Sequence, residues 1–87
     1  MAAALQVWSS TYSRAFDSLP PSIREIVQKK VDQMGTRLGA FPHQRLQGMS
    51  EFRLRVGEYR VIYGFDENQG RLLLHYVGHR REIYRKR

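Results

Sequence analysis

The sequence predicts an α+β fold in which two N-terminal helices pack on an antiparallel sheet of about four strands. Apolar residues recur at helical spacing in the first half of the chain, whereas the second half alternates charged and apolar residues between glycine-containing turns. Helices followed by consecutive hairpins are typical of α+β proteins. With 87 residues, 41% of them hydrophobic, the chain is expected to form one domain over residues 1–87 with a single modest core.

The first half is expected to open with a short strand and a helix. Residues 5–8 ("LQVW") have the pattern of a strand. In residues 10–19 apolar side chains recur at i, i+3, i+4 and i+7, which predicts a helix with one apolar face made of Tyr12, Ala15, Phe16 and Leu19.

A second helix is expected after Pro20 and Pro21, which suit a turn before a helix. Ser22 and Glu25 have the spacing of a capping box at its start, and Gly35 is expected to end it. One stripe of this helix carries Ile23, Ile26, Val27, Val31 and Met34. The two helices therefore form an amphipathic hairpin, and the following "LGAFPHQ" is expected to be a loop.

The second half predicts strands and turns. "HQRLQG" is expected to hold a short edge strand, and "EFRLRV" and "YRVIYGF" flank a two-residue turn, Gly57-Glu58. Glycine at the first turn position favours a type II′ hairpin. A looser turn, "DENQG", leads into the strand "RLLLHYV", and "HRREIYRKR" is expected to close the chain with a short helical segment.

The Gly57-Glu58 turn also predicts the register of the hairpin. Val56 faces Tyr59, Leu54 faces Val61 and Phe52 faces Tyr63, and these pairs are expected to pack on the helices. On the other side Arg55 lies opposite Arg60, and Arg53 lies opposite Ile62. Like charges directly across a ladder destabilise it by roughly 0.2–1 kcal/mol, so an anion bound there would explain the arrangement. Alternatively, the arginines extend separately into water or pair with Glu51 and Glu82.

The charge balance points to an anionic partner. The chain has 15 Lys and Arg against 8 Asp and Glu, a net charge of +7, and twelve of the basic residues are arginine. The guanidinium fork matches phosphate oxygens bidentately, so nucleic acid is the leading partner, and a generally basic surface is the alternative. The chain has no cysteine, no signal-peptide pattern and no apolar run long enough to cross a membrane. A cytoplasmic protein without membrane contact is expected.

Arg80 and Tyr84 follow the last expected strand, where the chain can curl over the arginine face. Several arginines beside a phenol are suited to holding a phosphate and moving a proton. The sequence contains no Ser-His-Asp set, paired carboxylates, phosphate-binding glycine loop or metal-ligand spacing. We therefore expect neither a metal nor a cofactor.

The segments "RLQG…FRLRVGEYRVIYGFD…LLLHYVGHRREIYR" and the helix "LPPSIREIVQKKV" closely resemble the RelE/ParE superfamily of toxins from bacterial type II toxin–antitoxin modules. The resemblance runs from about Ser18 to the C-terminus. It implies a RelE-like fold, a cognate antitoxin that wraps the toxin and blocks its site, and, for RelE-type members, metal-independent cleavage of mRNA on the ribosome. In that reaction the 2′-hydroxyl attacks the adjacent phosphate and leaves a 2′,3′-cyclic phosphate.

The resemblance also implies roles for individual residues. Arg60 of "EYRVIY" and Arg80 of "GHR" correspond to phosphate-stabilising arginines, and Tyr84 of "REIY" corresponds to the C-terminal tyrosine of the family. Arg53 stands where RelE has one of two strand lysines, and Glu51 stands at the other lysine position, which is a departure. Further RNA contacts are expected from Arg45, Arg55, Arg81, Arg85 and Lys86.

The general base stays open between two residues. Tyr84 qualifies if the arginines lower the pKa of its phenol, and His79 qualifies because it is adjacent to Arg80. Arg53 is a poor base because a guanidinium does not readily deprotonate. His43 is assigned no role, His75 a structural one, and Tyr59 and Tyr63 are expected in the core.

Two other functions fit the sequence. A ParE-like toxin would inhibit DNA gyrase with the same fold and without RNA chemistry. ParE-type proteins generally lack the catalytic residues found here, which counts against this alternative, whereas Glu51 in place of a lysine keeps it open. A non-catalytic module would only grip a nucleic-acid backbone, with a steep loss of affinity in salt.

Overall fold

The structure, a computed structural model, describes residues 3–46 and 51–83. Tyr84, Arg85 and Lys86, to which the sequence assigned a role, lie outside the described residues. In chain order the elements are β1 Leu5–Trp8, α1 Ser10–Asp17, α2 Pro21–Gly35, β2 Gln44–Arg45, β3 Phe52–Val56, β4 Tyr59–Asp66, β5 Arg71–His79 and α3 Arg80–Ile83.

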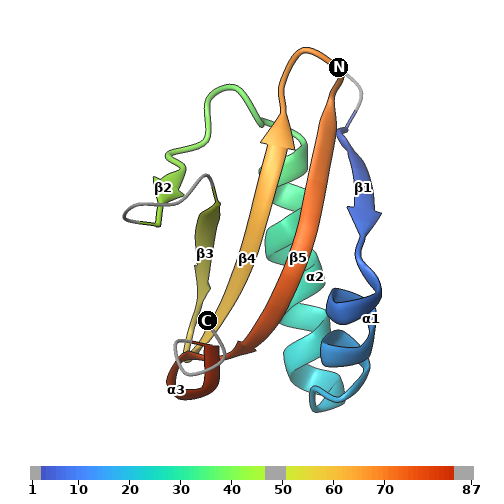
Figure 1. The fold of residues 1–87 in the computed structure, drawn as a ribbon, viewed down its shortest axis with the longest axis vertical. Helices are drawn as coiled ribbons and strands as arrows, with labels where there is room; N and C mark the ends of the chain where they lie inside the picture. The colour runs from blue at the N-terminus through green and yellow to red at the C-terminus, as the bar shows by residue number, and fades with distance from the viewer. Residues whose placement is uncertain (1–2, 47–50, 84–87) are drawn as a thin grey trace.

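The strands of the described residues form one five-stranded sheet in the order β1-β5-β4-β3-β2. α1 and α2 cover one face of this sheet, and α3 lies at the end where β3 turns into β4 (Figure 1). The predicted α+β fold is confirmed. The sheet has one strand more than expected, because β1 pairs parallel with the outer edge of β5 and so supplies partners for the backbone groups of that edge.

The two long helices begin differently. Ser9 caps α1, and its Oγ accepts a hydrogen bond from the Tyr12 N–H at 3.0 Å. α2 begins at Pro21 without a side-chain cap, so the predicted capping box of Ser22 and Glu25 is wrong. Proline suits the first helical position because it lacks an N–H and its φ is already helical, which moves the start ahead of Ser22.

None of the described helices is long and apolar enough to cross a membrane.

The β3–β4 hairpin has the predicted register at all five pairs, from Phe52 opposite Tyr63 to Val56 opposite Tyr59. Gly57 has φ +58°, and Glu58 does not have a positive φ. A positive φ at only the first central residue is the signature of a type II′ turn. The turn therefore sets which side chains of the two strands share a face.

The β4–β5 pair contains an irregularity that the sequence did not predict. Ile62 pairs with Tyr76 and Tyr63 pairs with Leu74, so His75 is an extra residue on β5. Such a bulge restores the apolar alternation on both sides of the extra residue. Leu74 and Val77 consequently both lie in the helix-side core despite their odd spacing.

His43 has a structural role that was not predicted from the sequence. Its Nε2 lies 2.7 Å from the Leu38 carbonyl oxygen and its Nδ1 lies 2.6 Å from the Tyr63 hydroxyl. A carbonyl only accepts, so Nε2 carries the proton and Nδ1 accepts from the hydroxyl. The ring also stacks on Phe65 with centroids 4.0 Å apart. His43 thereby fastens the loop after α2 to the sheet, and Tyr63 is fully buried in the core as predicted.

Candidate nucleic-acid interface

The arginines of the hairpin lie on the sheet face away from α1 and α2. Leu54 and Val56 are buried in the helix-side core, so Arg53 and Arg55, which alternate with them along β3, point to the opposite face, where both are exposed. Arg60 is directly across from Arg55 and shares that face. The hairpin therefore brings three of the predicted site residues together.

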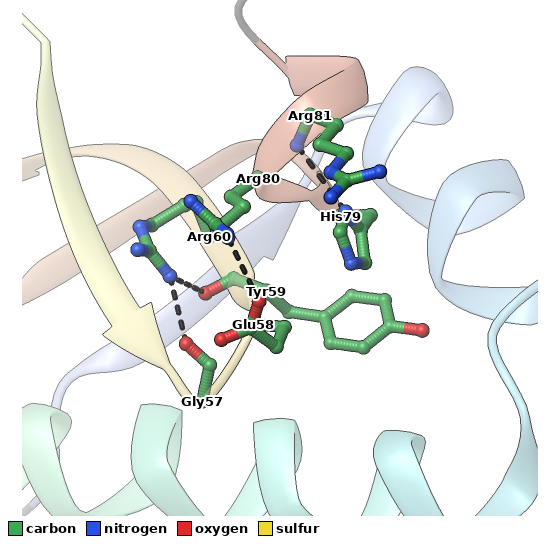
Figure 2. Close-up of polar contacts among 7 residues, drawn as sticks. All are labelled: Gly57, Glu58, Tyr59, Arg60, His79, Arg80 and Arg81. Atoms are coloured by element: carbon green, nitrogen blue, oxygen red, sulfur yellow. Dashed lines mark hydrogen bonds and ion pairs between the residues drawn. The ribbon is translucent and has the colours of Figure 1, made fainter.

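Arg60 is far less exposed than Arg53 and Arg55, with 8% of its surface accessible. One terminal guanidinium nitrogen donates to the Gly57 carbonyl at 2.9 Å and to the Tyr59 carbonyl at 2.8 Å (Figure 2). The other terminal nitrogen and Nε make no hydrogen bond to the described part of the chain. Arg60 thus braces the turn with one nitrogen and keeps donors for an anion with the others.

Arg80 reaches the same turn from α3. Its backbone N–H donates to the Glu58 carbonyl at 2.8 Å, and its Nε donates to the Glu58 carboxylate at 2.8 Å (Figure 2). The hydrogen bond and the charge of Arg80 lower the pKa of Glu58 below its usual range. Both side chains are well exposed, at 48% and 64%, so the ion pair is weak and open to competition from another anion.

His79 lies on the other side of the sheet from Arg60. It stands opposite Tyr59, and the two rings meet edge to face with centroids 5.4 Å apart on the helix side. Its Nδ1 accepts the backbone N–H of Arg81 at 3.2 Å, which caps the start of α3. It lines a separate hollow of about 540 Å³ with residues that include Arg14 and Glu82. The fold therefore places His79 beside Arg81 but on the opposite face of the sheet from Arg53, Arg55 and Arg60.

Two other predicted RNA-binding residues are also apart from this group. Arg45 pairs with Phe52 at the edge of the sheet, and its guanidinium lies 5.2 Å from the centre of the Phe52 ring. Arg81 is exposed on α3, one position beyond Arg80.

A hollow of about 810 Å³ lies between α2 and the edge of β3, and Arg53, Arg55 and Arg60 border it from the face away from the helices. Among the described residues, its lining contains five cations and no carboxylate: Lys30, Gln33, Thr36, Arg37, Phe41, Pro42, Gln44, Arg53, Leu54, Arg55 and Arg60. The contribution of Lys30 and Arg37 was not predicted. Lys30 and Gln33 share one stripe of α2, and Arg37 follows two residues after its end, but only the packing of α2 beside β3 shows what these side chains face.

Comparison with known proteins supports the same fold and identifies the family. Residues 7–84 match the family model of the ParE toxin of the type II toxin–antitoxin system parDE. No curated protein sequence matches the chain at a significant level.

Solved structures of RelE toxins have similar folds. The isolated E. coli RelE toxin is 19% identical, with 97% of this chain and 94% of that chain covered and a TM-score of 0.76. The RelBE2 toxin–antitoxin complex from Mycobacterium tuberculosis contains a chain that is 21% identical, with 90% and 99% covered and a TM-score of 0.75. The RelB–RelE complex from Methanococcus jannaschii contains a chain that is 19% identical, with 92% of this chain and 96% of that chain covered and a TM-score of 0.72.

The identities to these structures are low, so they establish the fold, whereas the family model spans nearly the whole chain. The register of the β3–β4 hairpin, the arginines on it and the family match over residues 7–84 all indicate the same family. The chain belongs to the ParE toxin family of type II toxin–antitoxin systems, within the RelE/ParE superfamily.

Proposed function

We propose that this toxin is a ribosome-dependent mRNA endoribonuclease. The observation that carries the proposal is the convergence of Arg60 and Arg80 on the β3–β4 turn, where a carboxylate of the chain already lies against Arg80. The Glu58 carboxylate stands in for a phosphate oxygen of the substrate. A pentacovalent phosphorane carries more negative charge than the ground-state diester, so guanidinium groups fixed around it favour cleavage.

In the proposed reaction the 2′-oxygen of a nucleotide forms a bond to the adjacent phosphorus while the bond to the 5′-oxygen breaks. A base removes the proton of the 2′-hydroxyl, and an acid protonates the leaving 5′-oxygen. Arg60 and Arg80 neutralise the phosphorane, with Arg53 and Arg55 as supporting cations. His79 caps α3 from the helix side, which leaves Tyr84 as the proposed base.

We also propose a cognate antitoxin and the ribosome as partners. RelE chains of similar fold have been solved as complexes with RelB antitoxins. The net charge of +7 favours an acidic antitoxin segment. Co-production with the antitoxin should then be needed for high yield.

The test is translation in a purified system. Wild-type protein should stop synthesis and leave mRNA cut at ribosome-occupied codons with 2′,3′-cyclic phosphate ends. Arg80→Ala should slow cutting by about 100-fold, whereas Arg71→Ala, which removes an exposed arginine at the far end of β5, should have no effect. Intact mRNA under conditions in which the protein is folded would refute the nuclease proposal.

A ParE-like inhibitor of DNA gyrase is the second candidate, and the ParE family match favours it. The absence of His79 from the arginine face is consistent with it, because gyrase inhibition needs no general base. A supercoiling assay separates the two: inhibition of purified gyrase without effect on translation would establish this function instead.

A further inference from the structure

We propose that the hollow between α2 and β3 binds the backbone of a single-stranded nucleic acid through Lys30 and Arg37 of one wall and Arg53 and Arg55 of the other. The nature of the polymer rests on the proposed function, which places RNA at the neighbouring turn. The site adds Lys30 of α2 and Arg37, two residues beyond the end of α2, and neither the sequence nor the family resemblance assigned them a role.

The charge of the hollow is the first argument. Five cations line it, and no Asp or Glu of the described residues does. Asp32 is on the same helix, but its carboxylate accepts hydrogen bonds from Gln6 and Gln28, toward β1. Cations gathered in one hollow repel one another, and a bound polyanion relieves that repulsion.

The free edge of β3 is the second argument. β2 pairs with Phe52 and Arg53, and no other strand of residues 3–46 and 51–83 lies on that side of β3 near the turn (Figure 1). In a two-residue hairpin the pair that closes the turn, Val56 and Tyr59, is hydrogen-bonded, and the bonding then alternates along the ladder. The N–H of Arg55 therefore points away from β4, toward the hollow, where it can donate to a phosphate oxygen.

The remaining lining favours a nucleic acid over an acidic polypeptide. Phe41 and Pro42 present ring surfaces, and the Arg37 guanidinium lies 5.5 Å from the centre of the Phe41 ring. Gln33 and Gln44 add neutral hydrogen-bonding groups. Cations that track a backbone, together with rings that stack on bases, are the usual means of holding single strands. A volume of about 810 Å³ accommodates a segment of polymer rather than a single ion.

The hollow is continuous with the turn, since Arg60 both lines it and braces Gly57. A strand whose phosphate lies between Arg60 and Arg80 can thus pass over Arg55 into the hollow. Lys30 and Arg37 would anchor the strand beyond the reacting phosphate.

The experiment measures binding of a labelled 2′-O-methyl oligouridylate of about twelve nucleotides by fluorescence anisotropy over a range of salt concentrations. This probe has no 2′-hydroxyl and cannot be cut by the proposed reaction. The Lys30→Gln/Arg37→Gln double variant should bind roughly tenfold more weakly at low salt, and the slope of log affinity against log salt should fall by about 1.4, for two lost phosphate contacts.

The matched control is Arg24→Gln/Lys29→Gln, which removes two charges of α2 that lie outside the hollow. It should change the slope by less than half as much. Equal effects of the two double variants would show that net charge alone drives binding and would overturn the proposal. A competition experiment with polyglutamate at matched charge gives a second way to overturn the proposal. If polyglutamate displaced the probe from the wild type but not from Lys30→Gln/Arg37→Gln, the ligand of the hollow would be an acidic polypeptide.

The two proposals fail separately. If the wild type cuts no mRNA but its affinity depends on Lys30 and Arg37, only the nuclease function is refuted. If it cuts mRNA while the two double variants bind alike, only the hollow is refuted.

Discussion

The β3–β4 turn and the α2–β3 hollow are both cationic, but they differ in how their cations are held. At the turn, Arg60 donates to two backbone carbonyls and Arg80 donates to the Glu58 carboxylate. Besides Arg60, which borders both, the hollow is lined by four exposed cations, Lys30, Arg37, Arg53 and Arg55, and by no carboxylate of the described residues. The hydrogen bonds of the turn hold its guanidinium groups in fixed positions, which stabilisation of a transition state requires. Exposed cations attract a polyanion but do not fix the position of the bound phosphates.

Arg55 and Arg60 show the same contrast within one cross-strand pair. They face each other, yet Arg60 is buried while Arg55 is exposed. The repulsion expected between them is reduced because the Arg60 guanidinium turns back to the carbonyls of residues 57 and 59. Arg60 therefore belongs to the folded structure as well as to the proposed site, and this distinguishes it from every exposed cation of the hollow.

The largest expected effect follows from replacing Arg60. Arg60→Ala should lower cleavage by at least about 100-fold and lower the free energy of unfolding by about 1.5–3 kcal/mol, because hydrogen bonds from a charged group are lost. Urea denaturation measures the second effect and the translation assay measures the first. Arg60→Lys keeps the charge and should recover part of the stability but little of the activity, since an ammonium cannot brace the turn and hold a phosphate together. Full activity in Arg60→Ala would exclude the residue from the site.

A smaller effect is expected at Gly57. Its φ of +58° is strained for any residue with a Cβ, and no atom of the described residues lies within 4 Å of the position that a Cβ would take, so none of them adds a clash to the strain. Gly57→Ala should therefore cost about 1–2 kcal/mol through the backbone alone, measured by urea denaturation. Gly35→Ala is the control, because the nearest contacts of its added Cβ are ordinary ones at 3.9 Å, and it should not destabilise the protein. Gly39→Ala is unsuitable because its Cβ would meet the Glu67 side chain. Equal losses at both positions would contradict a turn-specific strain.

The hairpin was predictable because its register depends on a local feature, the glycine at the first turn position. The capping box was mispredicted because two local signals competed, and Pro21 set the helix start. The bulge at His75, the fastening of the loop by His43 and the wall formed by Lys30 and Arg37 depend on contacts between distant segments. The face on which His79 lies likewise depends on how β5 pairs with β4.

Neutralising Glu58 tests whether the turn is occupied by its own carboxylate. Glu58→Gln removes the anion that holds Arg80, so the 2′-O-methyl oligouridylate should bind roughly two- to fivefold more tightly. Glu67→Gln, which removes an exposed carboxylate near the other end of the sheet, is the control and should change affinity less. Weaker binding by Glu58→Gln would show that the ion pair positions Arg80 for the ligand instead of competing with it.

The smallest and most specific effect is the pH dependence of the difference in probe affinity between Glu58→Gln and the wild type. Arg80 lowers the pKa of Glu58, so the carboxylate stays charged and paired throughout the neutral range and below the usual carboxylate range. Because the pKa is lowered in the folded protein, the ion pair stabilises the fold above the ordinary carboxylate pKa and is lost as the pH falls through the lowered one. The advantage of Glu58→Gln over the wild type in anisotropy titrations should therefore be constant near neutral pH and should disappear only in acid, below that lowered pKa. A difference that disappeared between about pH 6 and 7 would instead show that a group other than the Glu58 carboxylate controls the effect.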